Sequence, residues 1–318
     1  MVAPPSGGTM RSRNLDTLKG IALVNVATCA WATNIILGRY LRGQIGPLTL
    51  TAARSIVATV VFALILRKRP ATERKAGADL KLLSAMALAG VVLFAPTLYL
   101  GLRFTTAING TFINALGPLL TAGFAAWLIK EPFSVRQVIG AVSALAGVGV
   151  LVSGGFSSSA GKPLVNPGDL LIVLAAVLWA LYSIAVKKVV SHRSPVSATA
   201  LSMYIGLPFL LVAAVVESSI TPVTWSPGLL GIIVYLGLIP AALGFLSWNA
   251  GIKYLGAGGA MVFYNTLPLY GTLFGFLFLG ETLGPTHLAG GALILAGGLV
   301  AAIKKKASVE LTPQIVNK

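Results

Sequence analysis

Apolar stretches of roughly 18 to 24 residues, each about as long as a bilayer is thick, recur along almost the whole chain of 318 residues. Within hydrocarbon, backbone N–H and C=O groups find partners only in helices or closed barrels, which limits what such stretches can form. The composition agrees, because 56% of the residues are hydrophobic and only 10% are charged, too few to coat a soluble globule. The sequence therefore predicts an all-α membrane protein that lies in the lipid bilayer.

Glycines, prolines and charged residues separate these stretches and set their ends. Ten transmembrane helices are expected, at 20–38, 47–66, 82–102, 107–128, 134–153, 169–189, 196–216, 228–251, 256–279 and 285–303. Three further segments are expected: an N-terminal tail at 1–17, a linker at 154–168 between the fifth and sixth helices, and a C-terminal tail at 304–318.

Lysine and arginine are distributed unevenly over the two sides of this arrangement. With the N-terminus inside, nineteen of them lie on the inner side, four lie on the outer side and Arg54 lies within a span. The positive-inside rule then places both termini in the cytoplasm, in a multi-pass protein of the inner (cytoplasmic) membrane, with the linker 154–168 outside. The net charge of +16 is thus interpreted as a topology signal, and no nucleic-acid partner is expected.

The two halves of the chain resemble one another. At an offset of 150 residues, without gaps, the aligned pairs are Gly101 with Gly251, Pro118 with Pro268, Glu131 with Glu281, Gly140 with Gly290, and Gly147 with Gly297. A similar offset of 148 pairs Trp31 with Trp179. The predicted repeats are 18–153 and 169–303. Since each holds five spans, an odd number, the second copy is inverted, an architecture that favours transport by alternating access, although duplication could merely build a stable bundle.

Two blocks carry a family resemblance: Pro118 with Trp127-Leu-Ile-Lys130-Glu131, and its copy Pro268 with Phe278-Leu-Gly280-Glu281. They resemble the paired EamA-type repeats of the drug/metabolite transporter superfamily. The resemblance implies ten helices, five plus five inverted, around a central cavity lined mainly by helices 1, 3, 4, 6, 8 and 9. The segment Ser247-Trp248-Asn249 and the overall length look like exporters of aromatic and other neutral amino acids.

Aromatic and amide side chains at mid-membrane depth are the candidate substrate-binding residues. Trp31 and Asn34 share one helix face, and the repeat presents Trp179 and Tyr182 on the equivalent face, which could form an aromatic wall for an amphipathic solute. The alternative is that the tryptophans only fill space between helices. The full candidate set is Trp31, Asn34, Tyr99, Asn114, Trp179, Tyr182, Trp248, Asn249, Tyr264 and Asn265.

Charged residues and prolines supply further candidates. Arg54 could pair with a substrate carboxylate, or it could snorkel or bind a carbonyl, and Ser202 lies at the matching depth of the second half. Glu131 and Glu281 are expected to face the N-terminus of the helix that follows each of them, with a role in coupling as the alternative, and Asp169 is expected to face the N-terminus of the helix that it opens. Pro118 and Pro268 are interpreted as hinges, with static kinks as the alternative.

The function predicted from these features is export of small amphipathic metabolites, above all aromatic and neutral amino acids, by a secondary transporter. The alternatives are another metabolite or drug as cargo and, less favoured, a channel or a membrane enzyme. No catalytic residues, cofactor or metal site are expected, because Cys29 is solitary and His192 and His287 belong to no His/Cys/Asp cluster. The expected partners are a small molecule and the lipid bilayer, and the protein is expected to be a monomer or a homodimer.

Overall fold

A computed structural model describes residues 10–130, 134–152 and 166–302, and every regular element in these ranges is a helix. The first half contains α1 (Met10–Tyr40), α2 (Pro47–Arg67), α3 (Leu80–Met86), α4 (Phe94–Phe104), α5 (Ala107–Asn114), α6 (Gly117–Ile129) and α7 (Val135–Val152). The second half contains α8 (Pro167–Val189), α9 (Pro195–Ile220), α10 (Pro227–Leu238), α11 (Gly244–Tyr264), α12 (Leu267–Leu279) and α13 (Pro285–Ala302).

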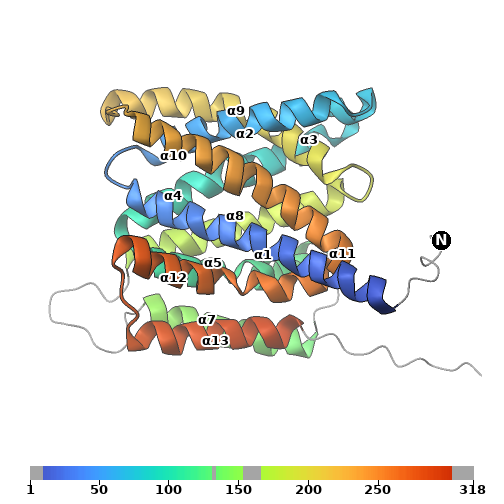
Figure 1. The fold of residues 1–318 in the computed structure, drawn as a ribbon, viewed down its shortest axis with the longest axis vertical. Coiled ribbons are helices and arrows are strands. Elements are labelled where there is room, and N and C mark those ends of the chain that lie inside the picture. Colours follow the sequence, from blue (N-terminus) through green and yellow to red (C-terminus); the bar gives the residue numbers. More distant parts are fainter. Residues whose placement is uncertain (1–9, 131–133, 153–165, 303–318) are drawn as a thin grey trace, which may run out of the picture.

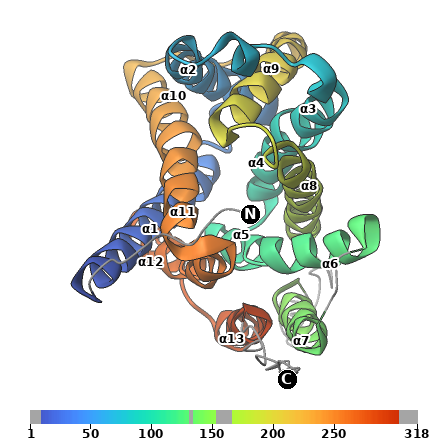
Figure 2. The same ribbon diagram turned by 90° about the vertical axis from the view of Figure 1, so that its right-hand side faces the viewer.

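The helices lie side by side, with α2 and α9 at one end of the long axis and α7 and α13 at the other (Figure 1). Seen along the helices, α1, α10 and α11 stand on one side, and α3, α4 and α8 stand on the other (Figure 2). The largest buried apolar cluster joins residues of α1, α4, α5, α8 and α10, so both halves share it. The candidate site described below lies between the two sides.

Proline and small polar residues set where many helices begin. Helices α2, α8, α9 and α10 all begin at a proline, whose fixed φ suits the first turn and whose missing N–H costs nothing there. Ahead of α9, the Ser194 hydroxyl accepts a hydrogen bond from the Ser197 N–H and so caps the helix.

Among the described residues, seven helical segments are long and apolar enough to cross a membrane, and three shorter apolar helices, Val135–Leu151, Leu267–Leu279 and Pro285–Ala301, accompany them. The protein is therefore a multi-pass membrane protein. Helix α11 is not straight, since the rings of Trp248 and Tyr264 lie 5.7 Å apart. Sixteen residues of straight helix would separate them by about 24 Å, so the chain reverses within α11.

Two long crossings contain a wide π-helical turn, at Ala87–Leu93 between α3 and α4 and at Ile239–Leu243 between α10 and α11. Pro240 lies within the second turn and Pro96 follows the first. A proline inside a helix removes one backbone hydrogen bond and crowds the carbonyl of the preceding turn, and a wider turn accommodates both effects. Such turns occur often at functional sites.

The two predicted hinge prolines each follow an interruption of a helix. Pro118 lies in the first turn of α6, just after the break that ends α5 at Asn114, and Pro268 lies in the first turn of α12, just after α11 ends at Tyr264. The breaks give each crossing a short non-helical joint. Whether the joints bend during a working cycle stays a prediction.

Helices α7 and α13 approach closely through glycine. A Cβ atom added to Gly147 would lie 2.5 Å from the Gly290 carbonyl oxygen, and one added to Gly290 would lie 2.7 Å from the Gly147 carbonyl oxygen. Gly140 and Gly297 face one another in the same reciprocal way. Because lipid supplies no hydrophobic force between helices, this close backbone contact helps to hold the pair together, as does the hydrogen bond from the Ser143 hydroxyl to the Leu293 carbonyl oxygen.

We expect Gly147→Ala to lower the thermal stability of the protein, by about 1–3 kcal/mol, because the added methyl group would overlap the α13 backbone. Gly149→Ala is the matched control, since a Cβ atom at Gly149, in the same helix, meets nothing within 4 Å. The measurement is the melting temperature in detergent by fluorescence-detected size exclusion. Equal melting temperatures for the two variants would contradict the close α7–α13 contact.

Candidate functional site

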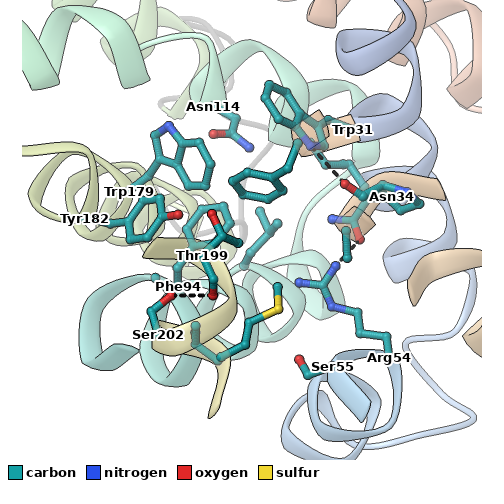
Figure 3. Close-up of a pocket in the computed structure, with 18 of the residues that line it drawn as sticks. Trp31, Asn34, Arg54, Ser55, Phe94, Asn114, Trp179, Tyr182, Thr199 and Ser202 are labelled. Atoms are coloured by element: carbon teal, nitrogen blue, oxygen red, sulfur yellow. Dashed lines mark hydrogen bonds between the residues drawn. The ribbon is translucent and has the colours of Figure 1, made fainter. Parts of the chain in front are cut away.

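A central cavity of about 80 Å³ lies between the two sides of the molecule, and residues from both halves line it. Figure 3 shows Trp179 and Tyr182 on one side and Trp31, Asn34 and Arg54 on the other. The volume is well below the roughly 300–1,000 Å³ that is typical of small-molecule sites. An amphipathic solute would therefore enter only if the lining side chains moved apart.

Aromatic rings form much of the wall. Trp31 lies 6.0 Å from Trp179 between ring centroids, edge to face, and 5.8 Å from Phe245. Trp179 in turn lies 5.1 Å from Phe94 and 5.3 Å from Tyr182, again between ring centroids. These spacings fit the edge-on and tilted packing that aromatic rings prefer, so the rings form one connected cluster that can pack against an apolar or aromatic solute.

The two π-helical turns hold the tryptophan-bearing helices at the cavity. The Trp31 indole N–H donates to the Pro240 carbonyl oxygen in the second turn at 3.2 Å. In the first turn, the absence of a side chain at Gly90 leaves the space that the Tyr182 ring occupies. The second turn therefore contacts an aromatic residue of α1, and the first turn contacts an aromatic residue of α8. Both turns form part of the cavity wall.

Arg54 of α2 enters the cavity beside two uncharged partners. Its Nη1 donates to Asn34 Oδ1 at 2.9 Å, and the Tyr99 hydroxyl donates to the same oxygen at 2.6 Å. The guanidinium also lies over the Tyr99 ring, 5.3 Å from its centroid. The Nε of Arg54 and the Oδ1 of Asn114 are buried with no hydrogen-bond partner. These two atoms are polar groups that a bound solute could satisfy.

The structure brings most of the predicted site residues together. Those that line the cavity are Trp31, Asn34, Arg54, Asn114, Trp179, Tyr182 and Tyr264. Tyr99 and Trp248 stand just behind the wall, where Tyr99 binds Asn34 and Trp248 packs 5.4 Å from Trp31. Asn249 and Asn265 are outside the lining, and Asn265 faces Gly298 of α13. A role of any of them in substrate binding stays a prediction.

Several lining residues escaped the sequence analysis as site candidates, among them Gly90, Phe94, Thr199, Met203 and Phe245. Apolar and small residues on a span look the same whether they face lipid or a cavity, so their types gave no signal. Ser202, noted only as the counterpart of Arg54, also lines the cavity. Two prolines within predicted spans, Pro96 and Pro240, were the visible signs that the backbone opens near the cavity.

A polar network around Glu281 and Arg39 joins α1, α4 and α5 to the segment that follows α12. Glu281 accepts hydrogen bonds from the backbone N–H groups of Ala107 (2.8 Å) and Ile108 (2.9 Å), at the start of α5, and lies 3.8 Å from Arg39 Nε. The Arg39 Nη1 donates to the Leu102 carbonyl oxygen at the end of α4. Glu281 was expected to face the helix that follows it, α13, and that prediction was wrong: tertiary packing brings its carboxylate to the N-terminus of α5. The counterpart Glu131 lies outside the described residues.

Asp169 lies in the first turn of α8, as expected for a carboxylate near a helix N-terminus, and it is buried. It also accepts hydrogen bonds from the Thr105 hydroxyl and the Asn109 amide, and so joins α8 to α5. Within the described ranges no three His, Cys, Asp or Glu side chains gather closely enough to hold a metal ion.

Comparison with known proteins gives concordant matches along the chain. The model of the EamA-like transporter family matches residues 18–153 and again 166–303. The uncharacterized transporter YyaM of Bacillus subtilis is 29% identical, over 83% of this chain and 87% of its own. A probable terminal-alkyne amino-acid exporter of Streptantibioticus cattleyicolor is 26% identical, over 88% of this chain and 92% of its own. A crystal structure shares the fold, with a TM-score of 0.59 at 24% identity, and covers 92% of this chain and 97% of that one.

We expect Glu281→Gln to destabilise the protein by about 1–2 kcal/mol, because a neutral amide has one acceptor oxygen for the two α5 N–H groups and no charge for Arg39. Asp16→Asn is the control, since that carboxylate is 57% exposed and its ion pair with Lys19 contributes little. The measurement is thermal unfolding in detergent. A Glu281→Gln melting temperature equal to that of Asp16→Asn would show that the network contributes nothing to stability.

Proposed function

Because the chain belongs to the EamA-like transporter family, it is a membrane transporter, and we propose that it exports small amphipathic metabolites, above all aromatic and neutral amino acids. The observation that carries this proposal is the central cavity, whose wall combines a tryptophan from each half with a few polar groups. Such a wall suits a solute with an apolar body and polar ends.

We propose that the protein crosses the membrane ten times as two inverted repeats of five spans. Reciprocal contacts support this arrangement. Helix α1 packs on α11 and α12, while its counterpart α8 packs on α4 and α6. Helix α7 packs on its own counterpart, α13, through Gly147 and Gly290 and through Gly140 and Gly297, as a twofold axis between the helices requires.

Smaller features repeat at the same offset of 150 residues. The π-helical turn 239–243 lies 150 residues after positions 89–93 of the first turn. Helices α6 and α12 both end in a left-handed residue, Lys130 with φ of 54° and Gly280 with φ of 64°. A left-handed backbone at the end of a helix is the conformation that glycine prefers. Because Lys130 adopts it too, the same backbone turn is kept in both halves although the residue type differs.

The halves would exchange conformations so that the cavity opens to each side in turn. The Glu281 network supports the interpretation that the structure is closed at the end where α4 meets α5, which the charge distribution assigns to the outer side. Alternating access requires this network to open, with the joints before Pro118 and Pro268 as hinges. On this assignment both termini are cytoplasmic, in the inner membrane.

Amino acids are the proposed cargo for two reasons. The relative in Streptantibioticus cattleyicolor is named as an amino-acid exporter. The cavity also places a guanidinium, at Arg54, beside an aromatic wall, and these groups match the carboxylate and the side chain of an aromatic amino acid. Another metabolite or a drug is the alternative cargo; a channel or an enzyme is less favoured.

The test is uptake of radiolabelled amino acids, spanning aromatic, aliphatic and charged types, into proteoliposomes. We expect saturable uptake of phenylalanine and other neutral amino acids, with counterflow, and a loss of tenfold or more in Trp31→Ala plus Trp179→Ala, because both rings of the wall are removed.

The control is Trp127→Ala plus Trp225→Ala, since these two rings are 74% and 53% exposed and lie outside the cavity. No uptake of any amino acid by a folded, reconstituted protein would overturn the amino-acid assignment. Flux that does not saturate would favour a channel.

A further inference from the structure

We propose that Arg54 is the residue that binds the carboxylate of the cargo, that Asn34 and Tyr99 position it, and that the cargo needs no ammonium group. The class of substrate is then an apolar or aromatic monocarboxylate, of which neutral amino acids are one kind. This inference deepens the proposed function and rests on transport through the same cavity.

The geometry around Arg54 leaves its binding edge free. Asn34 Oδ1 takes one N–H of the guanidinium and the Tyr99 O–H, so this oxygen is saturated. The Tyr99 ring covers one face of the guanidinium. Asn34 and Tyr99 together fix the plane of the guanidinium, while its Nε remains buried without a hydrogen-bond partner among the described residues. A planar guanidinium held in this way offers parallel N–H groups to the two oxygens of one carboxylate.

Within the part of the chain that the structure describes, the charge of Arg54 is not neutralised. No described carboxylate forms an ion pair with it, and the cavity lining contains no aspartate or glutamate. A charge away from water is costly unless it is paired, and a neutral amide oxygen and an aromatic face offset that cost only in part. An anionic cargo would supply the missing negative charge.

The same charge argues against recognition of an ammonium group at this place. In an amino acid the ammonium and the carboxylate are attached to one carbon, so a carboxylate bound to Arg54 brings the ammonium close to the guanidinium. Asn34, Ser55 and Ser202, which line this part of the cavity, are all uncharged. An ammonium would meet repulsion with no anion to offset it, whereas an analogue without the amine would not.

The experiment compares three ligands of similar size on the purified full chain: 3-phenylpropionate, its amide 3-phenylpropionamide, and L-phenylalanine. Binding is followed by quenching of tryptophan fluorescence, because Trp31 and Trp179 line the cavity. We expect wild-type protein to bind the acid at least about tenfold more tightly than the amide, and to bind the acid no more weakly than phenylalanine.

Variants then assign this preference to Arg54. We expect Arg54→Gln to remove the preference for acid over amide while amide binding is retained, and Arg54→Lys to keep part of it. Tyr99→Phe removes only the O–H that binds Asn34 and should lower the acid-to-amide ratio severalfold, an effect that lost packing alone would not produce. Arg42→Gln, at an exposed arginine of the α1–α2 loop, is the control and should keep the wild-type ratio.

The outcomes separate this inference from the proposed function. If wild-type protein binds the acid and the amide equally tightly, the proposed role of Arg54 is wrong. This holds whatever the variants show and even if phenylalanine is transported. Tighter binding of phenylalanine than of 3-phenylpropionate overturns the claim that no ammonium is needed. Failure of all uptake in proteoliposomes, with the acid-over-amide preference intact, overturns transport of these solutes and leaves carboxylate binding standing.

Discussion

Hydrocarbon offers no hydrogen-bond partner to a backbone or side-chain polar group, and the arrangement of this molecule follows from that constraint. Continuous helices satisfy their own backbone and can face lipid. Interrupted backbone and strongly polar side chains have to be enclosed by protein. The π-helical turns at Ala87–Leu93 and Ile239–Leu243 contribute to the wall of the central cavity, and Arg54 is turned into the same space.

Close approach of helices makes this enclosure feasible. Where Gly147 and Gly290 meet, the α7 and α13 backbones touch, and where Gly101 meets Gly168, α4 and α8 do the same. A methyl group added at any of these glycines would overlap the backbone of the facing helix. Small residues therefore hold the periphery tightly, while the largest rings, including Trp31 and Trp179, are collected in the centre. A closely packed frame around an aromatic centre suits a protein that has to admit a solute and release it.

Much of the candidate site could be predicted from the sequence because the membrane limits where polar residues can go. Trp31, Asn34, Arg54 and Trp179 stood out as unusual residues at depth, and all of them line the cavity. Phe94 and Phe245 could not be predicted in this way, since a phenylalanine on a span is equally at home against lipid. The partners of Glu281 were also out of reach, because α5 lies more than 170 residues away in sequence and only packing brings the two together.

The sequence by itself determined that the chain is a helical membrane protein, roughly where its spans lie, and which family it resembles, because hydropathy and repeated motifs are local properties of the chain. Only the tertiary structure decided which faces of the helices turn inward, where the helices open into wide turns, and that Arg54 meets Asn34 and Tyr99 instead of a carboxylate. These features depend on how helices cross, and a crossing depends on contacts between residues far apart in the chain.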